Sequence, residues 1–372
     1  MTKSHGILLT TLLLCSSVAY TQQTDYQKWK AERLQNYQSF SADYLQRYQS
    51  YKERVAERWG NGAELPDQHS YVTYSDDLTE KTVVDFARQE IRVETLAEPS
   101  ERQVTQLQRR AEQLLTKPIT QIAAEDPLLQ GLSLTADGSL LQALAPDLTP
   151  EQPLTDTKVS TEQIQIQLPT ESRSDASKKR VQRVTIKLNG HNFYQRRAEQ
   201  YRALVQEQAK AYGFDTALLL AIMQVESSFN PLAQSSIPAF GLMQIVPDSA
   251  GKDVNTRVFK RKQAPSAELL FKPQQNILFG TAYLNILDKT YLDGITDPLS
   301  RLYCTIAAYN TGAGNVAKVF HPRSEKRIGE AVSVINTLSA EQVYQRLLTD
   351  LPYDETRKYL QKVISAMPQY QL

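Results

Sequence analysis

The sequence predicts an α+β N-terminal domain followed by an all-α C-terminal domain. Three observations predict this order. Runs in which apolar and polar residues alternate occur before residue 190. From residue 192 onward, long helical periods are interrupted by Asn-Pro, Gly and Pro, and no run reads as a strand. A short apolar segment precedes both halves. We therefore predict a leader over residues 1–19, an α+β domain over 20–191 and an all-α domain over 192–372.

Composition sets broad limits on function. The chain has 372 residues, which is enough for two domains with ample cores. Its net charge of +1 gives no whole-chain electrostatic case for binding nucleic acid. A mean hydropathy of -0.45 excludes a polytopic membrane protein.

The N-terminus has the pattern of an export signal. Lys3 supplies a positive charge, residues 7–18 form a short apolar run, and Ser17-Val18-Ala19 offers small residues for cleavage before Tyr20. The run is shorter than the stretch that a transmembrane helix needs, so we expect export to the periplasm. The alternative is an uncleaved N-terminal anchor.

The two cysteines bear on membrane attachment and redox chemistry. Cys15 stands where a bacterial lipoprotein carries its lipidated cysteine, which would attach the protein to the outer membrane. A lipobox usually has a small residue before that cysteine, and here the residue is Leu14, so attachment and free release both stay open. Cys304 lies among apolar residues, which predicts a buried thiol and no disulfide framework.

Periodicity predicts the elements of the first half. Residues 24–60 carry aromatic or apolar residues every three to four positions, which indicates one long helix that packs on a neighbour. The later elements are strands over 71–74, 82–86, 90–94, 164–168 and 181–188, a helix over 101–116, an aperiodic stretch over 117–160 and a polar loop over 169–180. The second and third strands read as a hairpin. We identify no catalytic constellation in this half.

One carboxylate in the second half falls at an apolar position. A helix that starts at Asp215 places Glu226 on the same stripe as Leu218, Leu219 and Ile222. Burial disfavours the charged form of a carboxyl and raises its pKa, so such a group can donate a proton near neutral pH. The alternative is a Glu226 side chain that turns to solvent or pairs with a buried arginine.

Four segments of the second half together carry a family pattern. They are ESSFNP at 226–231, AFGLMQI at 239–245, AAYN at 307–310 and ETRKYLQKV at 355–363. In this order and spacing they resemble the catalytic domain of the soluble-type lytic transglycosylases, a lysozyme-like all-α fold. The strands of the first half resemble the N-terminal domain of the membrane-bound lytic murein transglycosylases.

The resemblance implies a role for each matching residue. Glu226 would be the catalytic acid, and the substrate-binding residues would be Ser235, Met243, Gln244, Tyr309, Asn310 and Tyr359, with the Tyr359 hydroxyl approaching the acid. Two positions depart from the family pattern, because Pro238 and Thr311 stand where glycine is usual. The resemblance implies no metal and no cofactor.

The implied reaction is cleavage of peptidoglycan glycan strands between N-acetylmuramic acid and N-acetylglucosamine without water, leaving a 1,6-anhydro sugar. A hydrolytic glycosidase normally needs a second carboxyl, and no Asp or Glu occurs between Glu226 and Asp248. Two alternatives stay open: a lysozyme-type muramidase that adds water, and a catalytically dead peptidoglycan-binding scaffold.

Overall fold

The computed structural model describes residues 43–96, 101–132, 134, 138–147, 158–166, 179–188, 192–321, 323 and 325–371. The leader, Cys15, the start of the long helix and most of the loop predicted at 169–180 lie outside these residues. Two compact units are distinguished, Met1–Gln46 and Arg47–Leu372. In the first unit, residues 43–46 are helical. The second unit holds all the other elements.

Residues 47–59 of the second unit are helical and lead into a short 3-10 turn, η1 (Gly60–Gly62). The apolar stripe predicted here is buried at Tyr51, Val55 and Trp59. The Trp59 indole donates a hydrogen bond to the carbonyl of Leu78 at 2.8 Å. The stripe therefore packs on protein, as the sequence indicated.

An antiparallel sheet follows, with the strand order β1-β2-β3-β5-β4. The strands are β1 (Ser70–Tyr74), β2 (Glu80–Asp85), β3 (Glu90–Thr95), β4 (Lys158–Ile166) and β5 (Lys179–Lys187). The predicted hairpin is confirmed, since β2 pairs with β3 in the register Val84↔Ile91. The prediction for β4 began six residues too late, because its first half lacks apolar alternation.

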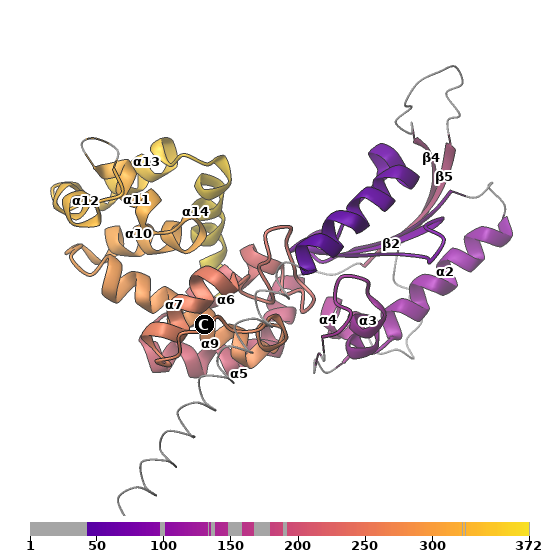
Figure 1. Cartoon of the computed structure of the whole chain (residues 1–372), viewed down its shortest axis with the longest axis horizontal. Helices are drawn as coiled ribbons and strands as arrows, with labels where there is room; N and C mark the ends of the chain where they lie inside the picture. The colour runs from indigo at the N-terminus through magenta and orange to yellow at the C-terminus, as the bar shows by residue number, and fades with distance from the viewer. Residues whose placement is uncertain are drawn as a thin grey trace, which may run out of the picture. The chain divides into compact units, whose positions relative to one another are not determined.

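Three helices accompany the sheet. Helix α2 (Glu101–Thr116) spans the predicted residues and packs on β3 and β5, beside the sheet in Figure 1. Helices α3 (Ile119–Glu125) and α4 (Leu140–Leu144) lie where we predicted no periodic element. Both are too short to show a helical period. Helix α4 begins instead with a local signal, a capping box in which Ser139 and Gln142 exchange hydrogen bonds.

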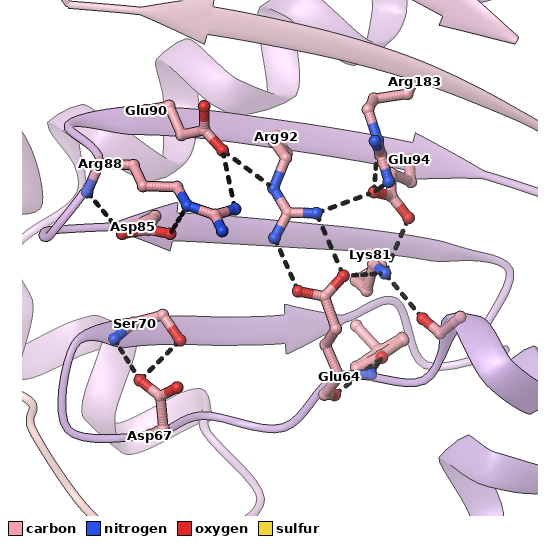
Figure 2. A network of polar contacts seen from close by, with 12 residues as sticks. Glu64, Asp67, Ser70, Lys81, Asp85, Arg88, Glu90, Arg92, Glu94 and Arg183 are labelled. Atoms are coloured by element: carbon pink, nitrogen blue, oxygen red, sulfur yellow. Dashed lines mark hydrogen bonds and ion pairs between the residues drawn. The ribbon is translucent and has the colours of Figure 1, made fainter. Parts of the chain in front are cut away.

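A charged network connects the sheet to the segment before it (Figure 2). The Lys81 ammonium, 1% exposed, lies 2.7 Å from both Glu64 and Glu94. Arg92 pairs with Glu64 at 2.7 Å, and Arg183 pairs with Glu94 at 2.7 Å. A buried charge is tolerated only when it is paired, and here each carboxylate contacts more than one cation. The network thus connects β2 and β3 to residues 62–64.

From residue 192 the described chain is helical, which confirms the all-α prediction. The main helices are α5 (Phe193–Tyr212), α6 (Thr216–Ser227), α9 (Pro273–Ile286), α10 (Pro298–Thr311), α11 (Ala313–Phe320), α12 (Ile328–Ile335), α13 (Ala340–Asp350) and α14 (Asp354–Ala366). Shorter elements are η3 (Pro247–Gly251), α7 (Lys252–Arg257), α8 (Ala267–Leu270), η4 (Leu287–Tyr291) and η5 (Met367–Tyr370). Helix α6 packs on α5, α14 and η5, and α10 packs on α9, α11, α13 and α14 (Figure 1).

Buried Arg197 of α5 ties the helical part to the earlier elements. Its guanidinium donates to the carbonyls of Leu144 at 2.8 Å, Phe86 at 2.5 Å and Ser228 at 3.1 Å. One side chain therefore joins the end of α4, the end of β2 and the residue that ends α6. Because residues 47–372 form one compact unit, the domain boundary at 191 stays a prediction.

Candidate active site

Helix α6 carries Glu226 into the interior. The Asp215 carboxylate caps the helix by accepting a hydrogen bond from the Ala217 amide at 2.8 Å, as predicted. Residues 217–223 are buried on every face, so α6 is a central helix and not one with a single apolar stripe. Glu226, the last residue but one of the helix, is 8% exposed. The central position of the helix therefore forces a carboxyl into the core.

The end of α6 is held in an unusual backbone conformation. Ser228 and Phe229 have left-handed φ angles of 52° and 63°. Such angles in residues other than glycine cost free energy and cluster at functional sites. The Ser227 hydroxyl donates to the Met223 carbonyl at 3.0 Å and lies 2.8 Å from the Leu242 carbonyl. The helix end is thereby fixed to the next segment of the site.

Burial controls the ionisation of Glu226. It raises the pKa of this carboxyl to about 8, from an ordinary value of 4.5. The negative charge of Glu355 raises the pKa further, and the Tyr359 hydroxyl lowers it. Glu226 is therefore mostly protonated at neutral pH, which is the state that a general acid requires.

The segment 239–245 folds tightly against α9. Gly241 has a φ of 75°, and a Cβ atom there would lie 2.4 Å from both Asn276 and the Leu270 carbonyl. Fully buried Asn276 donates to the carbonyls of Phe240 and Leu270 at 2.7 Å, and its side-chain oxygen accepts from the Met243 amide at 2.7 Å. The glycine is thus required by close approach as well as by conformation.

Gln244 presents an unsatisfied acceptor to this site. Its φ is 47°, and its side-chain nitrogen donates to the Gly241 carbonyl at 2.9 Å. The side-chain oxygen is buried and has no hydrogen-bond partner among the described residues. A buried acceptor without a partner is costly, so it is suited to receive a hydrogen bond from a bound molecule.

Helix α10 places Tyr309 and Asn310 between the 239–245 segment and α14. The Tyr309 hydroxyl donates to the Met243 carbonyl at 2.9 Å. The Asn310 side-chain oxygen accepts from the Thr356 hydroxyl of α14 at 2.7 Å. This pair of bonds connects α10 to the 239–245 segment on one side and to α14 on the other.

Tyr359 of α14 lies beside the acid. Its side chain is 5% exposed. Burial raises the pKa of the phenol most, and the nearby charge of Glu226 raises it further. In the described part of the chain, no group accepts from or donates to this hydroxyl in good hydrogen-bonding geometry. The phenol is therefore placed to interact more strongly with Glu226 when that carboxyl becomes charged.

These side chains surround a groove with a cavity volume of about 520 Å³. Five of the residues predicted from sequence line it: Glu226, Ser235, Gln244, Tyr309 and Asn310. Further lining residues are Gln68, Ile237, Tyr283, Tyr353, Glu355 and Thr356. The site thus combines one protonated carboxyl, several polar groups and exposed apolar side chains.

The segment that carries Glu226, Gln244 and Tyr309 matches a known family. Residues 203–331 match the family model described as the transglycosylase SLT domain. The chain carries an SLT domain. Residues 34–116 match the model of the N-terminal domain of membrane-bound lytic murein transglycosylase C. The two matches confirm the resemblances drawn from the sequence.

Curated relatives of this SLT-domain chain are named "Membrane-bound lytic murein transglycosylase C". Those from Yersinia pestis (strain Pestoides F) and Yersinia pseudotuberculosis (serotype O:1b, strain IP 31758) are 49% identical over 187 residues, covering 50% of this chain and 51% of each relative. The chain therefore spans about half the length of the curated relatives that it matches.

Two solved structures show a partial likeness. An inactive mutant of the lytic transglycosylase Slt from Pseudomonas aeruginosa has a TM-score of 0.34 and 27% identity, covering 45% of this chain and 23% of that one. The 70 kDa soluble lytic transglycosylase from Escherichia coli has a TM-score of 0.35 and 24% identity, covering 46% of this chain and 24% of that one.

Two of the predicted site residues lie off the groove lining. Met243 is fully buried, and its sulfur packs so closely on Gly280 that a Cβ there would lie 2.4 Å away. Its backbone serves the site instead, since its carbonyl accepts from Tyr309. Tyr359 is next to Glu226 but does not line the groove either. Direct contact of these two side chains with a substrate stays a prediction.

Sequence reasoning missed several polar contributors to the site, among them Glu355, Thr356 and Asn276. Glu355 and Thr356 belong to a motif from which only Tyr359 was chosen, so their signal was present. Asn276 carries no motif signal, because an isolated Asn in a helix is usually a surface residue. The second carboxyl, Glu355, lines the groove although it is far from Glu226 in sequence.

Another missed residue comes from the half in which we predicted no site. Gln68 precedes β1 and lines the groove. Its carbonyl accepts from the Asn230 side chain at 3.5 Å, and the neighbouring His69 ring lies 3.1 Å from the Ser228 hydroxyl. Nothing in the local sequence of Gln68 indicates this contact, which depends on the packing within the unit.

Neither metal ligands nor a membrane span emerge from the described residues. Within them, no group of three or more His, Cys, Asp or Glu side chains could hold a metal ion. Searching the same residues for a helix long and apolar enough to cross a membrane gives none. Cys304 is fully buried, as predicted, and burial raises the pKa of its thiol.

Proposed function

We propose that this protein is a peptidoglycan lytic transglycosylase that cleaves the β-1,4 bond between N-acetylmuramic acid and N-acetylglucosamine. The observation that carries the proposal is Glu226, a buried carboxyl at a polar groove whose pKa is raised to about 8. The SLT-domain match and the names of the relatives support the same activity.

The first step uses the proton that Glu226 holds at neutral pH. The carboxyl gives this proton to the glycosidic oxygen, so that the N-acetylglucosamine side leaves as an alcohol. The substrate's own N-acetyl group stabilises the positive charge that develops at the muramic C1 as the bond breaks. Glu226 is now a carboxylate in a buried position, which makes it a strong base.

The second step returns the proton to Glu226. The carboxylate takes the proton of the muramic C6 hydroxyl, and the freed oxygen forms a bond to C1. The product is a 1,6-anhydro sugar, and no water is consumed. An attacker within the same sugar has a large effective concentration over water, provided that the ring is held in a suitable pose. Gln244 and Asn310 are placed in the groove to hold it.

Replacing the acid tests this assignment. Glu226→Gln keeps the shape of the side chain but cannot donate and retrieve a proton, so cleavage of isolated sacculi should fall by about 1000-fold or more. Exposed Glu207 of α5 provides a matched control, and Glu207→Gln should retain the activity. A folded Glu226→Gln variant with near-normal activity would end the assignment.

A hydrolytic muramidase is the second candidate, and one observation favours it. Glu355 lines the same groove and is close enough to influence the pKa of Glu226. A hydrolase would use this second carboxyl as a base or nucleophile. The two candidates therefore differ in whether Glu355 is essential and in whether water enters the product.

We place the enzyme in the periplasm, where its proposed substrate lies. The basis is the leader pattern with Ser17-Val18-Ala19, and the relatives' name adds attachment to a membrane as a further proposal. Intact-mass measurement of the mature protein separates the two forms. Cleavage after Ala19 gives a free N-terminus, and attachment through Cys15 gives a diacylated one.

A further inference from the structure

Exposed apolar side chains gather at the candidate active site. Among the residues that the structure describes, four large apolar side chains are strongly exposed: Leu45, Ile237, Leu299 and Tyr353. Two of the four, Ile237 at 72% and Tyr353 at 56%, line the groove that contains Glu226. Exposed apolar surface that is grouped around a cavity commonly marks a binding site.

Hydrogen bonds restrain the backbone that carries Ile237. Ile237 lies in a tight turn in which the Ser235 amide donates to the Ala239 carbonyl at 3.2 Å, and the Ser235 hydroxyl donates to the Ile237 carbonyl. The exposure of Ile237 is therefore a property of the local fold and does not require a loose loop.

Tyr353 is restrained from both sides of its position in sequence. It directly precedes α14, and its carbonyl accepts a hydrogen bond from the Arg357 amide at 3.2 Å. Leu351, two residues earlier, is fully buried, and Thr356, three residues later, bonds to Asn310. The backbone that carries the Tyr353 ring is thus held beside the groove.

The distribution of polarity in this groove matches that of an N-acetylated sugar chain. A pyranose ring with equatorial hydroxyl groups has two faces formed by C–H bonds and an edge formed by polar groups. The C–H faces and the acetyl methyl groups favour apolar partners, and aromatic rings offer the largest such surface at low entropic cost. Gln244, Asn310 and Glu226 are available for the polar edge.

We propose that Tyr353 and Ile237 form an apolar rim that binds the glycan strand itself, with the Tyr353 ring stacked on the C–H face of a sugar and Ile237 against an acetyl methyl group. This proposal deepens the proposed function and rests on it, since it takes a glycan as the ligand. The rim would raise affinity for the strand without touching the bond that is broken.

Binding of a peptide-free sugar separates this proposal from contact with the peptide stem. The probe is a tetramer of N-acetylglucosamine, titrated calorimetrically into the full chain that carries Glu226→Gln. In this background Tyr353→Ala should weaken binding about tenfold, which is about 1.4 kcal/mol, and Ile237→Ala about threefold. Tyr353→Phe should recover most of the affinity, because it keeps the ring.

A matched control lies outside the groove. Leu299 of α10 is 45% exposed and does not line the cavity, so Leu299→Ala should leave the affinity for the tetramer unchanged. The four substitutions, at three exposed positions, are compared by circular dichroism and thermal unfolding, and substitutions at such positions should change stability little.

Four results would overturn the rim. One is a Tyr353→Ala affinity within twofold of the parent, and another is a loss as large in Leu299→Ala. The third is a loss that occurs with peptide-bearing muropeptides and not with the tetramer, which would assign the rim to the peptide stem. A parent that binds no tetramer would also contradict the proposal. Product analysis with the active enzyme is independent of these titrations, so the proposed reaction can stand where the rim fails.

Discussion

The Tyr359 hydroxyl lies beside the Glu226 carboxyl in a buried site, and each group shifts the pKa of the other. The phenol lowers the pKa of the acid, against the larger effect of burial, and the acid raises the pKa of the phenol. The hydroxyl has no partner in good hydrogen-bonding geometry among the described residues. A phenol next to a carboxyl that must lose and regain a proton indicates that Tyr359 acts when Glu226 becomes charged.

Tyr359→Phe should therefore slow turnover more than it weakens binding. The variant removes a donor that stabilises the carboxylate form, and this form is produced during the reaction. We expect kcat to fall about tenfold to 100-fold with little change in KM. Steady-state kinetics on soluble glycan strands measures both. A rise in KM at constant kcat would show instead that Tyr359 is a binding contact.

The raised pKa of Glu226 predicts how stability depends on pH. Between its unfolded value of 4.5 and its folded value of about 8, the folded protein keeps a proton that the unfolded chain has released. The free energy of unfolding should thus decrease as pH rises through this window, by up to about 1.4 kcal/mol per pH unit from this group.

Comparison with Glu226→Gln isolates this effect from other titrating groups. The two chains should be equally stable near pH 4, and the variant should become the more stable one as the pH approaches 8. Urea unfolding at a series of pH values gives the difference directly. Parallel curves across the window would mean that Glu226 has an ordinary pKa in the folded protein.

Glu355→Gln separates the one-carboxyl mechanism from the two-carboxyl one. In the proposed mechanism Glu355 only adds negative charge near the acid, so the variant should keep activity within about tenfold of the parent. Because the Glu355 charge raises the pKa of Glu226, the alkaline fall in activity should move to lower pH. Loss of activity by 1000-fold or more would favour the hydrolase.

Asn276 should be essential for the shape of the site although it lies outside the groove lining. Asn276→Ala removes the side-chain partner of the Met243 amide and of the Leu270 carbonyl, and one of the two donors to the Phe240 carbonyl, which should cost about 3 kcal/mol or more. Asn255→Ala, at a buried residue with one bond to the Gln263 carbonyl, should cost about 1 kcal/mol and retain activity. Equal losses of stability and activity in the two variants would contradict this role.

The sequence predicted the fold where elements are long and strongly periodic. The hairpin of β2 and β3, helix α2 and the capped start of α6 at Asp215 all follow from local patterns, and the structure has them there. Helices α3 and α4 were missed, because five to seven residues are too few to show a period. Their positions depend on packing and on a cap, not on amphipathicity.

The candidate site was predictable as far as its residues belong to contiguous motifs. Glu226, Gln244, Tyr309 and Asn310 were found in this way, and they line one groove. Gln68 and Asn276 could not be found, because their roles arise from tertiary contacts between segments far apart in the chain. Met243 illustrates the reverse, since a residue inside a motif is placed in the core and serves through its backbone.

The mass of the sugar product tests the central proposal most directly. Purified enzyme is incubated with isolated sacculi, and the released muropeptides are analysed by mass spectrometry without chemical reduction. Because the C6 hydroxyl and not water attacks C1 in the proposed reaction, the products should be 1,6-anhydro muropeptides, lighter by one water than hydrolysis products. Predominantly hydrated, reducible ends would contradict the account and favour a muramidase.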